Sequence, residues 1–266
     1  MSTHPDTTNL LQRTDRNGAV YLTMNDPDKM NALSEDMLTV LQAQLDLIAE
    51  DPSVRCVVLS GKGKAFCAGH DLKQMRAHPD QAYYQTLFRR CSTMMQSIVS
   101  LPVPVIARVH GIAVAAGCQL VSSCDLAIAG RSARFGVSGI NVGLFCSTPA
   151  VALSRNVSAK RAFDMLVTGD LIDAETAEDW GLISSAVDDA ELDDAVVQKV
   201  DKILSKSPSA IRFGKSMFHA QRQMSLSEAY ELAGNVMADN MMTDDVSEGI
   251  DAFLEKRKPT WKQLPE

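Results

Sequence analysis

Two short segments of small residues could present backbone amides, rather than side chains, as the active groups. In AFCAGHD (65–71), a tight turn leaves the amide of His70 pointing outward. In VAAGCQL (114–120), the amide of Ala116 lies at the start of a predicted helix, where unpaired N–H groups and the helix dipole favour negative charge. Two such donors directed at one oxygen atom form an oxyanion hole. Each segment alone also fits an ordinary glycine-containing turn, so a purely structural role stays open.

The neighbours of these two amides are expected to border a ligand. Ala68 belongs to the first turn, and Gly117 allows close approach at the second. Asp71 is expected to cap or brace the loop, and Leu72 follows it. We therefore expect Ala68, Asp71, Leu72 and Gly117 to contribute to substrate binding.

Side chains that could add chemistry are fewer. Gln119 stands at the start of the predicted helix, but an amide neither gains nor loses a proton near neutral pH. The His70 imidazole either holds its loop or borders the ligand pocket. In LFCSTP (144–149), Cys146, Ser147 and Thr148 could orient water or a substrate carboxylate. A nucleophile needs a partner base, and no sequence-adjacent group supplies one. A catalytic role for Ser147 stays open.

Composition indicates a soluble protein with a large packed core. The chain has 266 residues, of which 45% are hydrophobic and 22% charged, enough for one large domain or a domain with an appendage. A net charge of −7 argues against nonspecific nucleic-acid binding. The apolar runs are strand-length, far short of a membrane span. The N-terminal segment is polar and has no signal-peptide apolar region, so we expect a cytoplasmic protein.

The cysteines give no sign of a metal site or a disulfide framework. The six thiols form no CxxC pair, have no histidine at metal-ligand spacing, and are mostly flanked by apolar or small residues. We expect buried free thiols and no bound metal.

Strand and helix patterns alternate through the first part of the chain. AVYLTM (19–24), RCVVLSG (55–61) and VPVIARVHG (103–111) have the pattern of strands. Helices are predicted after Ser34 and over residues 81–100. This alternation predicts an α/β fold with parallel crossovers, in which the two small-residue segments follow strands.

From residue 158 onward the pattern becomes almost entirely helical. We place the core in residues 1–200 and a helical oligomerisation region in residues 201–266. The stretch SLSEAYELAGNVMADNMM (225–242) is too rich in Met and Leu for a fully exposed helix. Near the end stands a basic triplet that begins at Lys256, which fits either a solvated face or a phosphate contact.

Several segments together resemble the crotonase (enoyl-CoA hydratase/isomerase) superfamily. KAFCAGHDL (64–72) resembles its first signature, and residues 102–144 resemble its longer central signature. LVTGDLIDAETAEDWGLIS (166–184) and GIDAFLEKRKPTW (249–261) resemble later family segments, so the likeness covers about residues 10–262. In local detail AAGCQL and GINVGLFCSTP resemble hydratase-domain-containing members related to mitochondrial ones.

The resemblance implies a fold, a ligand and an assembly. The fold is a spiral of ββα units with a helical C-terminal trimerisation region, and the assembly is a homotrimer or hexamer. The ligand is an acyl-CoA thioester whose carbonyl oxygen is held by the amides of His70 and Ala116. Coenzyme A is then part of the substrate, with no separate cofactor, and Lys256 could meet its phosphates on a neighbouring subunit. Nucleic-acid and membrane partners are not expected.

The sequence departs from the family at the two places that carry acid–base glutamates in a hydratase. These places match Gln119 and Gly139, neither of which can transfer a proton. Hydratase activity is therefore expected to be low, and replacing both residues with glutamate should raise it if the scaffold is otherwise intact. Three functions stay open: an enolate-stabilising, hydratase-like acyl-CoA enzyme; a decarboxylase or thioester hydrolase; and a non-catalytic acyl-CoA binder.

Overall fold

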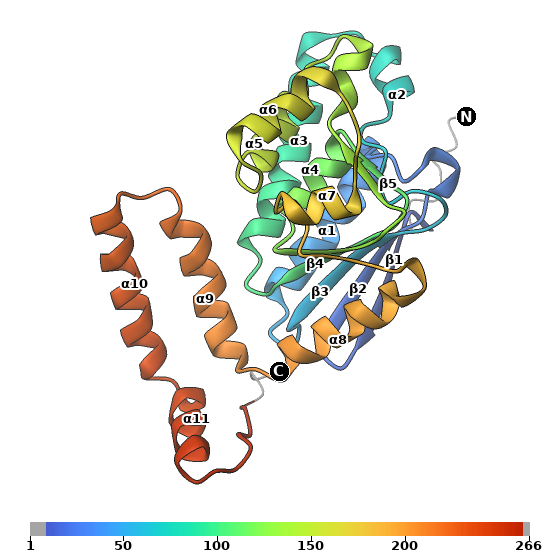
Figure 1. Ribbon diagram of the computed structural model, residues 1–266. Coiled ribbons are helices and arrows are strands. Elements are labelled where there is room, and N and C mark those ends of the chain that lie inside the picture. Colours follow the sequence, from blue (N-terminus) through green and yellow to red (C-terminus); the bar gives the residue numbers. More distant parts are fainter. Residues whose placement is uncertain (1–8, 263–266) are drawn as a thin grey trace.

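The computed structural model describes residues 9–262, which fold into an α/β core and a projecting helical arm (Figure 1). The strands are β1 (Leu11–Arg16), β2 (Ala19–Met24), β3 (Cys56–Gly61), β4 (Val105–Val109), β5 (Ile112–Val114), β6 (Leu126–Gly130), β7 (Arg134–Gly136), β8 (Ile172–Asp173) and β9 (Ser185–Val187). The α-helices of the core are α1 (Glu35–Glu50), α2 (Leu72–Ala77), α3 (Gln81–Ser100), α4 (Ala116–Ser123), α5 (Ser147–Leu153), α6 (Ala159–Thr168), α7 (Ala174–Asp179) and α8 (Leu192–Leu204). Short 3₁₀ segments are η2 (Pro27–Lys29), η3 (Ser138–Val142) and η4 (Asp189–Glu191).

Two sheets form the core. The larger has the strand order β1-β2-β3-β4-β6-β9, and all its pairs are parallel except the β1–β2 hairpin. The smaller has the order β5-β7-β8. The chain passes from β4 to β5 and from β6 to β7, adding a strand to each sheet at each turn. This mixed α/β fold confirms the predicted class, and the predicted C-terminal helical region is present.

Burial follows the sequence pattern closely. Ser34 caps α1 by accepting a hydrogen bond from the Met37 amide, at the place where the sequence predicts a helix start. One stripe of α1 is apolar and buried: Met37, Leu38, Leu41, Leu45 and Ile48. β3 reads CVVLSG and is almost wholly buried, because α1 and α3 cover one face of the sheet and α8 covers the other. The predicted helix over residues 81–100 coincides with α3.

The smaller sheet brings the two small-residue segments together. Cys67 forms a parallel bridge with Ala113 of β5, its amide donating to Ile112 O (3.1 Å) and its carbonyl accepting from the Val114 amide (3.0 Å). The loop that follows β3 therefore runs beside β5, directly before α4. These backbone hydrogen bonds place the predicted oxyanion donors on adjacent stretches of chain.

After α8 the chain leaves the core as an arm of α9 (Pro208–Gln221), α10 (Leu226–Met241) and α11 (Asp244–Leu254) (Figure 1). One of its ties to the core is Asp125, whose carboxylate accepts from the buried Lys215 ammonium (2.7 Å) and lies 2.8 Å from His219 Nε2. Burial lowers the pKa of Lys215, which remains paired with Asp125. The arm is thus anchored at α9, while α10 has no buried residue.

Two details differ from the sequence prediction. The region after residue 158 contains β8 and β9 besides its helices, because each short strand completes a sheet edge built elsewhere in the chain. The predicted boundary at residue 200 falls inside α8, whose buried Val196 and Val200 pack on the core. Residues 1–8 and 263–266, which belong to the predicted regions, lie outside the described residues. Within residues 9–262, no helix combines the length and apolarity needed to cross a bilayer.

Candidate active site

The amides of His70 and Ala116 are both free at neighbouring turns. Within residues 9–262, neither N–H donates a hydrogen bond to a protein group. The turns are in close contact, since a Cβ built on Gly69 would lie 3.2 Å from the Ala116 nitrogen. Gly69 also has φ +89°, which side-chain-bearing residues rarely adopt. The structure thus brings together the two donors that sequence analysis singled out.

Gly117 permits this approach. A Cβ at position 117 would overlap the carbonyl oxygen of Cys67, the same carbonyl that accepts from Val114. Gly117 is fully enclosed in α4, and the loop 65–71 passes directly over it. The glycine is therefore required by backbone packing, and its side of the site has no side chain to contact a ligand.

Ala115 sets the direction of the Ala116 amide. It precedes α4 with φ 50° and ψ −118°, a conformation that favours glycine, and its side chain makes no capping hydrogen bond. Its backbone is held at both ends, because its amide donates to Gly136 O (2.9 Å) and its carbonyl accepts from the Gln119 amide (3.1 Å). The Ala115–Ala116 peptide carries the free amide that the sequence predicts as an oxyanion donor, so this strained conformation sets the direction of that amide.

Ala115→Gly is expected to stabilise the fold by about 1 kcal/mol, because relief of strain of about 1–3 kcal/mol outweighs the extra chain entropy of glycine. Urea denaturation measures the change. The exposed Ala43 in α1 provides the control, since Ala43→Gly in an ordinary helix interior should instead lower stability by about 1 kcal/mol. A loss of stability in Ala115→Gly would mean that the methyl packed against Gly69 matters more than the strain.

Gln119 is a buried neutral group in the first turns of α4. It is 5% exposed, and among the described residues its Oε1 atom has no hydrogen-bond partner. It stands three residues after Ala116 on the same face of α4, and helical side chains lean toward the helix N-terminus. This neutral amide has no capacity for proton transfer.

The His70 ring is also neutral. Its Nδ1 atom lies 3.2 Å from Leu33 O, which places the ring proton on Nδ1 and leaves Nε2 as an acceptor. Burial lowers the pKa of His70, so the imidazole is uncharged at pH 7. Nε2 is buried and has no partner among the described residues. His70 and Gln119 thus each carry a buried polar side-chain atom without a partner among the described residues.

Gly139 has no room for a larger residue. A built Cβ would lie 2.5 Å from Leu144 O and 2.8 Å from Cys146 Sγ, and the Gly139 amide donates to that sulfur (3.3 Å). Burial raises the pKa of the Cys146 thiol, which therefore stays protonated. The expectation that a glutamate could simply be restored at position 139 is incompatible with this packing.

Three other predicted site residues, Asp71, Leu72 and Ser147, are not close-packed as Gly139 is. Asp71 caps α2 by accepting from the amides of Lys73 and Gln74, as the sequence indicated, and Leu72 is exposed. Ser147 is exposed, and its hydroxyl donates only to Phe145 O (3.4 Å) among the described residues, so no base adjoins it.

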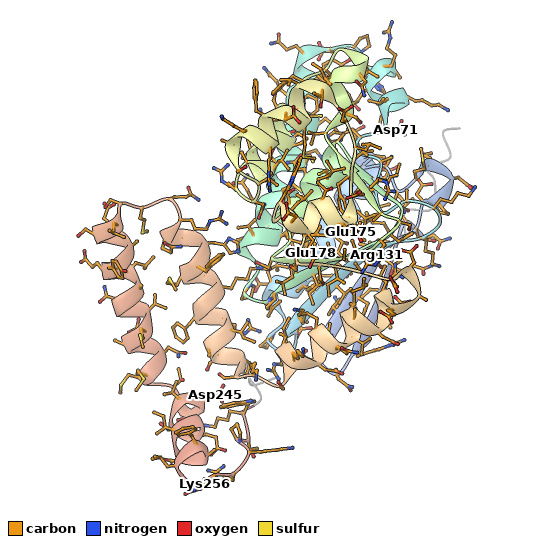
Figure 2. All side chains as sticks on the ribbon, in the orientation of Figure 1. Asp71, Arg131, Glu175, Glu178, Asp245 and Lys256 are labelled. Atoms are coloured by element: carbon orange, nitrogen blue, oxygen red, sulfur yellow. The ribbon has the colours of Figure 1, made fainter. Side chains whose placement is uncertain are left out.

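The last two predicted binding residues, Ala68 and Lys256, lie far apart in the structure. The Ala68 amide donates to Met30 O (3.0 Å), which fixes the first turn. Lys256 follows Glu255, the C-cap of α11, and Figure 2 shows it at the opposite end of the molecule from Asp71. Its neighbour Arg257 is paired with Glu248 and Glu255. A contact between Lys256 and a ligand at His70 would require a second copy of the chain.

Sequence reasoning missed Ala115 and the space-filling role of Cys146. The only signal for the first was the run of small residues before α4, where glycine would be expected at a left-handed position. The six cysteines are free, and all but Cys124 are buried. Within residues 9–262, no cluster of His, Cys, Asp and Glu side chains has the arrangement of a metal site.

Comparison with known proteins shows which family this chain resembles. A family model described as enoyl-CoA hydratase/isomerase matches residues 14–264. Enoyl-CoA hydratase domain-containing protein 3, mitochondrial, is 42% identical in Xenopus laevis, over 98% of this chain and 88% of that protein. The human protein of that name is 43% identical over 93% of this chain and 82% of its own length.

Two solved structures of proteins with related names are similar to this chain over nearly its whole length. The crystal structure of an enoyl-CoA hydratase from Mycobacterium smegmatis has 56% identity and a TM-score of 0.94, covering 95% of this chain and 98% of that one. Human enoyl-CoA hydratase domain-containing protein 3 has 42% identity and a TM-score of 0.92, covering 95% of this chain and all of that one.

The comparisons correct one expectation and confirm another. The expected cytoplasmic location is contradicted, because the similar proteins from Xenopus laevis, rat and human are named as mitochondrial. The resemblance read from the signature segments is confirmed by both the family match and the structural likeness. The chain belongs to the enoyl-CoA hydratase/isomerase family, within the crotonase superfamily.

Proposed function

We propose that this protein binds an acyl-CoA thioester and stabilises the enolate of its acyl group without the proton transfers of a hydratase. Family membership supports an acyl-CoA enzyme of crotonase type. The observation that carries the proposal is the pair of free amides at His70 and Ala116, on turns that touch at Gly69. Donors fixed before the ligand arrives stabilise developing negative charge on a carbonyl oxygen effectively.

The chemistry around the hole supports an atypical reaction. Gln119 is neutral and buried, and the Cys146 thiol fills the space next to Gly139. General acid–base catalysis contributes about 10²–10⁴-fold per group, so hydration of an enoyl thioester would be slow. The thioester brings its own coenzyme A, and this proposal requires no further cofactor.

Decarboxylation is the second candidate, favoured by the neutral polar groups at the hole. Loss of CO₂ from a malonyl-type thioester leaves an enolate directly, so it needs oxyanion stabilisation and a desolvated carboxylate but no essential base. The buried Gln119 and the neutral His70 ring are compatible with a reaction that needs no base. Thioester hydrolysis would need an activated water or nucleophile, and Ser147 has no adjacent base.

Acetyl-CoA is expected to bind, while free acetate is not, because the hole recognises a thioester carbonyl and coenzyme A supplies most of the contact area. Titration calorimetry with both compounds tests this directly. Crotonyl-CoA should bind as well but be hydrated at least about 100-fold more slowly than by a glutamate-bearing hydratase. Absence of thioester binding at millimolar concentration would refute the proposal.

We also propose a homotrimer or a hexamer built through the arm, which is expected to be the only form at micromolar concentration. The arm has large exposed apolar side chains that a monomer would leave in water: Leu226, Tyr230, Met237, Met241, Phe253 and Leu254. In such an assembly Lys256 of one subunit could reach coenzyme A bound to another. Light scattering that gives the 28.9 kDa monomer would reject this assembly.

A further inference from the structure

A row of aromatic rings begins at the proposed oxyanion hole. The His70 ring meets the Phe88 ring edge-on, with centroids 5.6 Å apart, and Phe88 is stacked with Tyr84 at 6.4 Å and 22°. Tyr84 and Phe88 are one helical turn apart on α3, so they share a face. The Tyr84 hydroxyl donates to Met75 O (3.1 Å), which holds this face against α2.

The row continues to the corner between α2 and α3. Tyr83 lies 5.7 Å from Tyr84, and His78 lies 5.0 Å from Tyr83, both measured between ring centroids. Phe88, Tyr84 and Tyr83 are partly exposed, and His78 is exposed. Each of these aromatic residues therefore keeps part of its surface accessible.

His70 links this row to the ligand position. It supplies one amide of the proposed hole, so we place the acyl group of a bound thioester close to its ring. Its Nε2 atom is buried without a partner, as is Oε1 of Gln119 beside the other amide. Buried polar atoms are nearly always hydrogen-bonded, so two unpaired ones flanking the hole indicate that a bound molecule completes this site.

We propose, building on the function above, that the acyl pocket prefers an aromatic acyl group to a straight alkyl chain of equal carbon number. Aromatic rings interact favourably edge-on or offset at centroid separations of about 4.5–7 Å, the spacing already present in the row. A rigid ring also loses less conformational freedom on binding than an alkyl chain with several rotatable bonds. The substrate class is therefore an aryl or arylacyl thioester of coenzyme A.

Calorimetry with phenylacetyl-CoA, octanoyl-CoA and acetyl-CoA tests this, because the first two have acyl groups with equal numbers of carbon atoms. Phenylacetyl-CoA is expected to bind at least tenfold more tightly than octanoyl-CoA. Phe88→Leu keeps an apolar side chain but removes the ring, and should reduce that preference at least fivefold with acetyl-CoA affinity unchanged. The exposed Phe163 on α6 gives the matched control, since Phe163→Leu should change none of the three affinities.

The outcomes separate this inference from the proposed function. Equal affinity for phenylacetyl-CoA and octanoyl-CoA, or a preference untouched by Phe88→Leu, overturns the aromatic pocket and leaves thioester binding standing. Failure of all three thioesters to bind overturns the proposed function itself. If Phe88→Leu does not fold, as judged by thermal unfolding, Tyr84→Leu makes the same comparison from the next ring of the row.

Discussion

Ala116→Val is expected to reduce acyl-CoA affinity and any turnover at least 100-fold. Ala116 is buried at the first position of α4, and its amide faces the turn at Gly69. A branched side chain adds two methyl groups beside that amide and keeps the thioester oxygen away from it. Loss of one oxyanion donor costs about 10²–10³-fold in rate, and blocking the hole should cost no less.

A core alanine on a different element, the strand β6, separates this effect from general overpacking. Ala127 of β6 is equally buried, so Ala127→Val should lower the melting temperature through a comparable strain but leave thioester binding intact. Both variants are compared by calorimetry with acetyl-CoA and by thermal unfolding. Full binding by a folded Ala116→Val protein would place the ligand somewhere other than these two turns.

Gln119→Glu is expected to raise crotonyl-CoA hydration by about 10²-fold, the lower end of the contribution of one acid–base group. Glutamate has nearly the same shape as glutamine, and the start of α4 favours a negative charge. Adding Gly139→Glu should give no further increase and should destabilise the fold, because Leu144 O and Cys146 Sγ occupy the space of its Cβ. Absorbance of the enoyl thioester follows the reaction.

Two further variants test the causes of these two expected results, the gain from Gln119→Glu and the lack of gain from Gly139→Glu. Gln119→Leu has a similar size but no polar group, and should show no gain in hydration. Cys146→Ala combined with the two glutamates removes only one of the two obstructions, since the Leu144 carbonyl belongs to the backbone. A Gln119→Glu, Gly139→Glu protein with hydratase-level turnover and unchanged stability would show that the 139–146 loop rearranges freely.

The local features of the chain could be predicted from the sequence because they depend on residues that are neighbours in the sequence. The stripe of apolar residues in α1, its Ser34 cap and the limits of α3 follow from helical periodicity and capping. The alternation of strands and helices was sufficient for the α/β class. The signature segments identified the family, although the polar N-terminus led to a wrong location.

Only part of the candidate site could be predicted from the sequence. Small residues and a helix start pointed to the amides of His70 and Ala116, because backbone donors at such turns arise from local geometry. The sequence also identified Gln119 and Gly139 as groups unable to transfer protons. It placed Ser147 near the chemistry, but the described structure provides no base beside it.

Tertiary contacts decided the rest. The Cys67–Ala113 bridge joins two segments far apart in the chain, and only that pairing makes the free amides neighbours. The strained Ala115 is held by Gly136 O, and Cys146 Sγ fills the space beside Gly139. Sequence periodicity records which face of an element is buried, but not which distant backbone atom will lie against it. The closeness of the two free amides and the closed position 139 depend on such distant contacts, because packing of remote segments sets the space around each residue.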